Sequence, residues 1–386
     1  MADKFSAFCI GGTSSGDGKT TVAIALLRAL RNRGLKVQPF KCGPDYIDPT
    51  FHRLAAGSSS RNLDGWMMGS DAVRQSFTKG CHYADCAVIE GVMGLFDSSA
   101  PGSLEGSTAQ IATLTGAKVI LTVNARGMAN SIAAMVKGYC EFNPDLKIAG
   151  VIANKVGSEN HANILRESLK LAGLPPLLGY LPRNDAWQLP ERHLGLVPFL
   201  ENEKSEDWFN ELAEAAEKCF DIDMLLRATV GTRPVAAHNQ ISDRRKVRLG
   251  LALDKAFHFY YRDNLEMLEN HGFELVPFSP IKDEVLPPCC ATLYIGGGFP
   301  EEFAAELSAN DSMRRAVRNF SGTILAECGG YMYLSNAIDQ FPMCGIVSAE
   351  ATMNNRLRSL GYRQVELLHD TFLGPVGTDL RGHEFH

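Results

Sequence analysis

The sequence predicts an α/β protein with two doubly wound domains, the first of which is a parallel-sheet domain with a phosphate-binding loop. Its 386 residues are enough for two or three domains of about 150 residues each. Short apolar runs alternate with stretches of helical spacing, as expected where buried parallel strands alternate with covering helices. The alternation breaks once, near residue 228, and then restarts.

The first domain is expected to span residues 1–228. The apolar runs that predict its strands are 5–12, 36–43, 86–92, 118–124 and 147–156. The stretches that predict its helices are 21–34, 128–142 and 159–173.

A polar segment at 229–245, with a glycine, a proline and no sustained period, predicts a linker. The second domain is expected to span 246–386. Its predicted elements are strands at 247–254, 273–279, 291–298 and 322–330 and a helix at 261–272.

Composition and charge exclude several classes of protein. The net charge of −6 and the isoelectric point near 6.0 argue against nucleic acid or a membrane surface as a partner. No apolar run is long enough to cross a bilayer, and the N-terminus has no signal-peptide pattern. The 10 cysteines include no C-x-x-C pair, which argues against a zinc ribbon or a disulfide framework. We therefore expect a cytoplasmic protein.

The stretch CIGGTSSGDGKTT, residues 9–21, predicts a phosphate-binding loop between a strand and a helix, where N–H groups and the helix dipole attract anions. It ends as the pattern G-x-x-x-x-G-K-[ST] does, although Thr13 stands in place of the first glycine. Gly11 and Gly12 allow the turn slightly earlier, and a plain strand-to-helix turn is the alternative. The residues expected to bind the nucleotide are Thr13, Ser14, Ser15, Gly16, Asp17, Gly18, Lys19, Thr20 and Thr21.

Acidic side chains follow two further predicted strands. Glu90 ends the strand at 86–92, and Asp45 and Asp48 follow the strand at 36–43. Doubly wound sheets bind ligands at these strand ends, so we expect Thr20, Glu90 and Asp48 to hold Mg²⁺ and Lys19 to reach the outer phosphates. Turn chemistry beside the neighbouring prolines is the alternative for Asp45 and Asp48.

Asn154 lies at the end of another strand and is expected to hydrogen-bond a purine edge, with a turn residue as the alternative.

The second domain contains a predicted nucleophile. TILAECGGYMYL places Cys328 at a sharp turn from strand to helix, where the helix N-terminus activates a thiol. Gly297 and Gly298 follow another strand and are expected to form an oxyanion hole. A cysteine nucleophile requires a base, and His369, His383 and His386 are downstream candidates.

Several ordered motifs resemble one family, the cobyrinic acid a,c-diamide synthases. They are GTSSGDGKTT, FKCGPDYIDPTFH, EGVMGLFD and LPERHLGLV in the first half, then FHFYYRDNLEMLE, IGGGFPEE and AECGGYMYL. The second set is similar to a class I glutamine amidotransferase domain, and the loop is similar to that of dethiobiotin synthetase. The resemblance covers almost the whole chain.

The resemblance implies ATP-dependent amidation of the a and c acetate side chains of cobyrinic acid, a corrinoid, with glutamine or ammonia as nitrogen donor. The acetate would be activated as an acyl phosphate, with Mg²⁺ bound beside ATP. Asp45, Tyr46, Asp48 and Asp97 would orient the substrate carboxylate or a second metal ion. Cys328 would attack glutamine, and Arg192 and His193 would pair with corrinoid carboxylates, with a structural role as the alternative for His193. A homodimer is one state that the resemblance allows.

The family's activating histidine lies beyond the GHEFH block, within which this chain ends. We therefore expect the amidotransferase half to lack its C-terminal part and synthesis with ammonia to survive better than synthesis with glutamine.

Three alternatives remain at this stage. Hydrogenobyrinic acid and nickel sirohydrochlorin are acceptors for the same chemistry, and residue types do not distinguish them. Cobyric acid synthase has a similar domain order, but GPDYIDP and ERHLGL favour the a,c enzyme. A partitioning ATPase would carry a lysine early in the loop, where this chain has Thr13 and Ser14. The order of the two amidations and the path of ammonia are not encoded in recognisable motifs.

Overall fold

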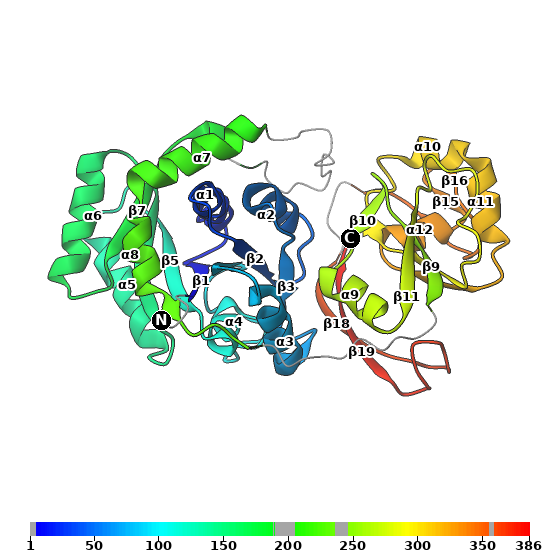
Figure 1. The fold of residues 1–386 in the computed structure, drawn as a ribbon, viewed down its shortest axis with the longest axis horizontal. Coiled ribbons are helices and arrows are strands. Elements are labelled where there is room, and N and C mark those ends of the chain that lie inside the picture. The colour runs from blue at the N-terminus through cyan, green and yellow to red at the C-terminus, as the bar shows by residue number, and fades with distance from the viewer. Residues whose placement is uncertain (1–4, 188, 190–204, 236–245, 355–358) are drawn as a thin grey trace. The chain divides into compact units, whose positions relative to one another are not determined.

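The computed structural model describes residues 5–187, 189, 205–235, 246–354 and 359–386. The chain forms two compact units, coloured along the chain in Figure 1. Of the described residues, 5–187, 189, 205–235 and 359–385 belong to the first unit, and 246–354 and 386 belong to the second. The expected α/β class is confirmed in both units.

An eight-stranded sheet forms the centre of the first unit, in the order β3-β2-β4-β1-β5-β6-β7, with β8 paired to β1. The first seven strands are parallel and β8 is antiparallel. The strands are β1 (Phe5–Gly12), β2 (Val37–Cys42), β3 (Arg61–Leu63), β4 (Cys86–Glu90), β5 (Lys118–Asn124), β6 (Ile148–Val156), β7 (Leu177–Pro182) and β8 (Val230–Gly231).

Helices cover both faces of this sheet (Figure 1). They are α1 (Lys19–Asn32), α2 (Asp48–Ala56), α3 (Gly69–Cys81), α4 (Thr108–Thr115), α5 (Ser131–Phe142), α6 (Glu159–Leu171), α7 (Glu206–Cys219) and α8 (Ile222–Ala228), with a short 3₁₀ turn at Asp185–Trp187. The central strand β1 is buried along its whole length, which explains its continuous apolar sequence. Helix α1 begins at Lys19, as expected for a helix that opens at the end of the loop, and Gly18 adopts a left-handed conformation just before it.

The second unit has its own four-stranded parallel sheet, in the order β11-β9-β12-β14. Its longer strands are β9 (Val247–Ala252), β11 (Phe273–Phe278), β12 (Thr292–Ile295) and β14 (Thr323–Ala326), and its short strands are β10 (Phe257–Phe259), β13 (Gly297–Gly298), β15 (Ala337–Ile338), β16 (Phe341–Pro342) and β17 (Glu350–Ala351). Its helices are α9 (Arg262–Asn270), α10 (Ala304–Ala309), α11 (Asp311–Arg318) and α12 (Gly329–Leu334).

The last two strands, β18 (Leu360–Glu366) and β19 (Asp379–Phe385), form an antiparallel hairpin. This hairpin packs with the first unit, although its residues fall within the range expected for the second domain. The reason is a set of side-chain contacts with Asp64 and Trp66, which follow β3.

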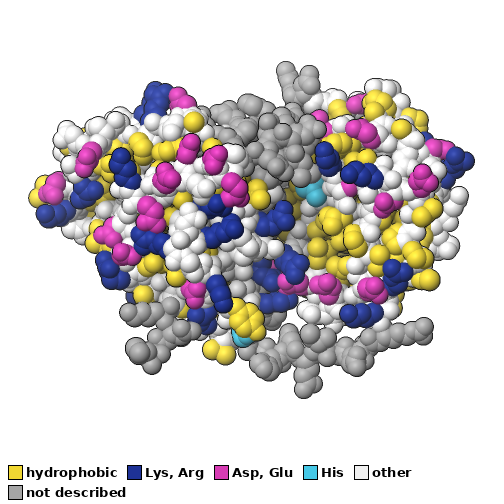
Figure 2. Space-filling model, turned by 45° about the horizontal axis from the view of Figure 1, so that its top comes forward, with side chains coloured by type: hydrophobic (Ala, Val, Ile, Leu, Met, Phe, Trp, Pro, Cys, Tyr) yellow, Lys and Arg dark blue, Asp and Glu magenta, His cyan; other side chains and the backbone are white. Residues whose placement is uncertain are grey.

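Acidic and basic side chains are interspersed over the face of the molecule in Figure 2, in line with the small net charge. Among the described residues, the helices are too short or too polar to span a membrane.

Candidate active sites

The phosphate loop is held in shape by Asp17, which is only 4% exposed. Its carboxylate accepts hydrogen bonds from the Thr13 hydroxyl at 2.5 Å and the Ser14 backbone N–H at 2.6 Å. The Lys19 ammonium donates to the Ser14 carbonyl oxygen at 2.9 Å. The predicted loop residues are therefore brought together around one turn at the N-terminus of α1, the arrangement that favours an anion.

Two glycines around this loop have no room for a side chain. A Cβ on Gly12 would lie 2.9 Å from the Lys19 side chain, and one on Gly18 would lie 1.9 Å from the Asn154 amide nitrogen. Thr13, in place of the expected glycine, anchors the loop through its hydroxyl, which donates to Asp17. Its backbone carbonyl also accepts from the Tyr139 hydroxyl at 2.7 Å. The missing glycine is therefore compatible with an ordered loop.

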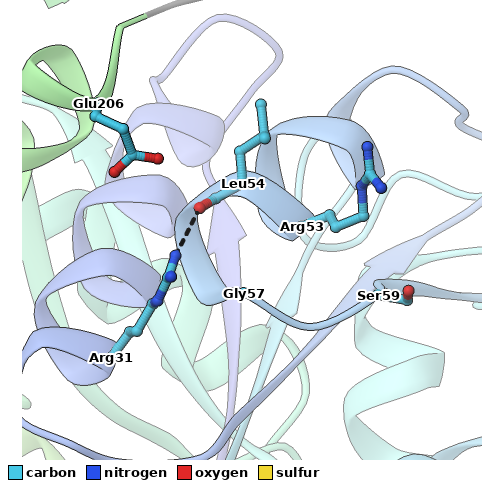
Figure 3. Close-up of a pocket in the computed structure, with 6 residues that line it drawn as sticks. All are labelled: Arg31, Arg53, Leu54, Gly57, Ser59 and Glu206. Atoms are coloured by element: carbon cyan, nitrogen blue, oxygen red, sulfur yellow. Dashed lines mark hydrogen bonds between the residues drawn. The ribbon is translucent and has the colours of Figure 1, made fainter.

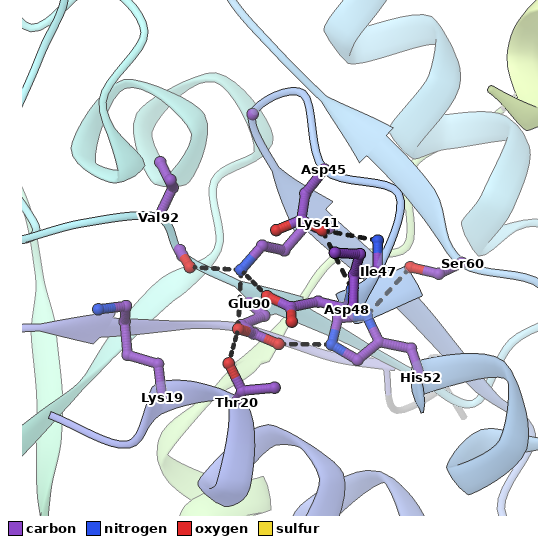
Figure 4. A network of polar contacts seen from close by, with 12 residues as sticks. Lys19, Thr20, Lys41, Asp45, Ile47, Asp48, His52, Ser60, Glu90 and Val92 are labelled. Carbon is purple, nitrogen blue, oxygen red and sulfur yellow. Dashed lines mark hydrogen bonds and ion pairs between the residues drawn. The ribbon is translucent and has the colours of Figure 1, made fainter. Parts of the chain in front are cut away.

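A buried polar network lies beside the loop (Figure 4). The Thr20 hydroxyl donates to Glu90 Oε1 at 2.6 Å, and the Lys41 ammonium lies 2.7 Å from the same oxygen. Lys41 also forms an ion pair with Asp48 at 2.7 Å. Residues from α1, β2, β4 and α2 therefore meet at the carboxyl ends of the strands, as the sequence predicted for Thr20, Glu90 and Asp48.

Two members of this network, Lys41 and His52, were missed by the sequence analysis. His52 lies in α2, with Nε2 2.5 Å from Glu90 Oε2 and Nδ1 3.2 Å from the Ser60 hydroxyl. A lysine inside an apolar strand was the available signal for Lys41, because such a charge is rarely buried without a partner. His52 carried no comparable signal, since it lies on a helix that the sequence did not predict.

The two lysines have pKa values shifted in opposite directions. Burial alone would lower the pKa of Lys41, but the charges of Asp48, Glu90 and Asp45 outweigh it and raise that pKa well above its ordinary value. Burial, and then the charge of Lys41, lowers the pKa of Lys19. Of these two lysines, Lys19 is therefore the one whose charge is less compensated by the protein, as suits a residue that meets phosphates.

The remaining predicted acids lie in turns beside the network. Asp45 Oδ1 accepts from the backbone N–H groups of Ile47 at 2.8 Å and Asp48 at 3.1 Å. Asp97 is exposed and accepts from the Gly94 N–H at 2.7 Å. The turn of Asp97 is joined to the phosphate loop, because Leu95 N–H donates to the Gly12 carbonyl at 2.8 Å. Tyr46 lies between Asp45 and Asp48 in the chain and is half-buried.

The oxygen atoms at this site fit a hard divalent cation such as Mg²⁺ in part. Thr20 Oγ1 and Glu90 Oε1 converge, and hydroxyl and carboxylate oxygens are ligands that Mg²⁺ accepts. Asp48 and Glu90 are both paired with Lys41, so Mg²⁺ would share these carboxylates with that lysine.

Asn154 supports the loop directly, since its amide donates to the Asp17 carbonyl oxygen at 2.8 Å. Its expected contact with a purine stays a prediction. Arg192 and His193, expected to bind substrate, lie outside the described residues.

Cys328 occupies the predicted elbow between β14 and α12. It has φ 50° and ψ −113°, a strained conformation typical of an exposed nucleophile. Removal of the thiol from bulk water raises its pKa, while hydrogen bonds from the backbone N–H groups of Gly329 and Gly298 lower it. A neighbouring carboxyl, Glu301, is half-buried, and burial raises its pKa to about 7.

Both predicted oxyanion glycines lie beside this cysteine. A Cβ on Gly297 would come 3.4 Å from the Cys328 Cβ, and one on Gly298 would come 2.0 Å from the Ala256 carbonyl oxygen. Gly298 also has φ 156°, a conformation that favours glycine. Gly298 therefore packs too closely against the Ala256 backbone to admit a side chain.

A shallow pocket of about 490 Å³ is lined by Arg31, Arg53, Leu54, Gly57, Ser59 and Glu206 (Figure 3). Arg31 lies in the last turn of α1, and its guanidinium donates to the Leu54 carbonyl at 3.0 Å. A helix of 14 residues is about 20 Å long, so this pocket lies far from the phosphate loop at the other end of α1.

Comparisons with known proteins agree with these two sites. Residues 8–197 match the family described as "CobQ/CobB/MinD/ParA nucleotide binding domain", and residues 248–386 match the "CobB/CobQ-like glutamine amidotransferase domain". The nucleotide-binding loop of the first unit and the Cys328 elbow of the second together define an ATP-dependent ligase that uses glutamine for amidation.

The most similar relatives include three cobyrinate a,c-diamide synthases. That of Syntrophotalea carbinolica is 48% identical over 98% of this chain and 84% of its own length. That of Listeria monocytogenes serotype 4b is 44% identical over 98% and 86%, and that of Leptospira interrogans is 43% identical over 100% and 86%. The chain belongs to the cobyrinate a,c-diamide synthase family.

Proposed function

We propose that the enzyme amidates the a and c acetate carboxylates of cobyrinic acid, using ATP and glutamine and passing through acyl-phosphate intermediates. The observation that carries this proposal is the convergence of Lys19, Thr20, Glu90, Lys41 and Asp48 at one sheet edge. That arrangement suits transfer of a phosphoryl group to an anionic acceptor, because charge neutralisation is the main requirement of the reaction.

The carboxylate of the acceptor is a poor electrophile, so it must first be activated. In our proposal its oxygen attacks the γ-phosphorus of ATP, the bond to the bridging oxygen breaks, and ADP departs. Lys19 stabilises the charge on the transferring group. Bound Mg²⁺, held by Thr20 and Glu90, would neutralise the phosphate charges. Asp45, Tyr46 and Asp97 line the neighbouring turns and orient the acceptor.

Ammonia then attacks the acyl carbon, and phosphate leaves with the bonding electrons. We propose that Cys328 supplies this ammonia from glutamine through a thioester, which water hydrolyses to glutamate. The backbone N–H groups around Gly298 stabilise the tetrahedral oxyanion.

The test is phosphate release from Mg-ATP with cobyrinic acid, comparing ammonium chloride with glutamine. We expect release that depends on the corrinoid, with one ADP and one phosphate per amide formed. Release that is indifferent to the corrinoid would overturn the choice of acceptor. Hydrogenobyrinic acid and nickel sirohydrochlorin, assayed in parallel, would then identify the acceptor among macrocycles of the same chemistry.

A further inference from the structure

The β18–β19 hairpin belongs to the amidotransferase part of the sequence but packs on the nucleotide-binding unit. Tyr362 stacks on Trp66 with 4.5 Å between ring centroids and 25° between the planes. The Tyr362 hydroxyl also donates to Asp64 Oδ2 at 2.8 Å. Both partners follow β3 directly, so the hairpin lies at the carboxyl end of the sheet, where the phosphate loop also lies.

The opposite strand of the hairpin contacts the same tryptophan. The Arg381 guanidinium lies 5.0 Å from the Trp66 ring centroid and donates to the Trp66 carbonyl oxygen at 3.0 Å. It also lies 3.9 Å from the Glu105 carboxylate. Stacking, cation–π contact and hydrogen bonds from both strands indicate a specific docking of the hairpin.

Docking places His383 beside the acidic turn after β2. Its ring centroid is 6.1 Å from that of Tyr46, which lies between Asp45 and Asp48. Burial lowers the pKa of His383, while the charges of Asp64 and Asp45 act in the opposite direction. The turn itself is fixed to β3 by Asn62, whose amide donates to the carbonyl oxygens of Asp45 at 2.7 Å and Gly43 at 2.9 Å.

We propose that the β18–β19 hairpin forms one wall of the acceptor site and that His383 contacts the polycarboxylate macrocycle there. This inference rests on the proposed function, in which Tyr46 and Asp45 orient the acceptor. It adds that the synthetase reaction depends on a segment encoded in the amidotransferase region, even when free ammonia is the nitrogen donor.

The experiment uses the full chain with ammonium chloride as donor, so that glutamine hydrolysis has no part in the rate. His383→Ala removes the imidazole, and His383→Gln restores a donor of similar length. Tyr362→Ala removes the stack on Trp66 and the hydrogen bond to Asp64. Phe372→Ala is the matched control, since Phe372 lies in the same hairpin and is 61% exposed.

We expect His383→Ala and Tyr362→Ala to raise the KM for cobyrinic acid at least tenfold, with little change in the KM for ATP. His383→Gln should recover part of the loss, and the control should behave as wild type. Quenching of tryptophan fluorescence by cobyrinic acid measures binding without turnover and should weaken in the same two variants.

An unchanged KM and unchanged quenching in both variants would overturn the inference while leaving the proposed function intact. Wild-type enzyme that neither binds nor consumes the corrinoid would instead overturn the proposed function, and the inference with it.

Discussion

His52 and Glu90 lie side by side in the interior of the first unit, with 2.5 Å between Nε2 and Oε2 and at most 1% of either residue exposed. The contact fixes one oxygen of Glu90 and leaves the other to Thr20 and Lys41. Ser60, at 3.2 Å from Nδ1, orients the imidazole in turn. The chain Ser60–His52–Glu90 thus positions the carboxylate that we assign to the metal ion.

His52→Ala should therefore lower the affinity of the site for Mg²⁺ more than it lowers the stability of the fold. We expect the Mg²⁺ concentration for half-maximal activity to rise about 10–100-fold, the usual effect of losing a residue that orients a metal ligand. His52→Gln, which retains a hydrogen-bond donor, should recover part of it. Mg²⁺ titrations of phosphate release check this, and equal midpoints in wild type and His52→Ala would contradict it.

Lys41→Met should destabilise the first unit. It leaves the carboxylates of Asp48 and Glu90 buried without their common cation, and such a loss costs about 3–5 kcal/mol. The double variant with Asp48→Asn should recover part of the stability, because one of the two uncompensated charges is removed. Urea unfolding of the three proteins provides the measurement, and a double variant no more stable than the single one would disagree with this account.

Gly18→Ala should abolish nucleotide binding, whereas Gly16→Ala should only weaken it. Both glycines have positive φ, 89° at Gly18 and 81° at Gly16, so alanine costs about 1–2 kcal/mol at either position. Only at Gly18 would the new Cβ also collide with the Asn154 amide. Calorimetric titration with Mg-ATP compares the pair, and similar affinities in the two variants would be inconsistent with the collision.

Cys328→Ser should stop glutamine hydrolysis and glutamine-dependent synthesis but leave ammonia-dependent synthesis within about twofold of wild type. The reason is that only the thioester step requires the thiolate. Cys289→Ser is a suitable control, because Cys289 is exposed and belongs to the same unit. Parallel assays of glutamate and phosphate release decide the matter, and loss of both activities in Cys328→Ser would argue against separate sites.

Glu301 should make the stability of the second unit depend on pH. The pKa of Glu301 is about 7 in the folded protein, above the ordinary value of 4.5. Between pH 4.5 and pH 7 the native state therefore keeps a proton on Glu301 that the unfolded state has lost. The free energy of unfolding should therefore fall as pH rises from about 4.5 to 7, by at most about 3 kcal/mol. Glu301→Gln should remove this slope, which urea unfolding at pH 5 and pH 8 measures.

Glu301→Gln should also shift the pH–rate profile of glutamine hydrolysis toward lower pH. Ionised Glu301 raises the pKa of Cys328, so its removal favours the thiolate. A pH–rate profile that is identical in wild type and Glu301→Gln would show that the carboxylate does not act on the thiol.

The sequence predicts the central strands well, because each is buried on both faces and therefore continuously apolar. The strands expected at 5–12 and 118–124 have those bounds in the structure. The turns that carry the loop residues and Cys328 also lie where the sequence predicts them, since strand–glycine–helix patterns are local in the sequence. The sequence did not predict the partners of Glu90. Lys41 becomes a neighbour of Glu90 only through the parallel register of β2 and β4, which pairs the two residues.

The contacts of the β18–β19 hairpin could not be predicted either, because they too join residues that are distant in the sequence. Tyr362 and Asp64 are 298 residues apart, and neither belongs to a pattern that indicates its partner. Short strands such as β15, β16 and β17 have only two residues each and carry no measurable period.

The docking of the β18–β19 hairpin has a consequence for attempts to divide the enzyme into two separately expressed proteins. A cut near residue 245 would separate Trp66 from Tyr362 and Arg381 and expose a tryptophan that the intact chain covers. A split enzyme, or a chimaera with a foreign glutaminase, would have to keep residues 359–385 matched to the nucleotide-binding partner rather than to the cysteine elbow.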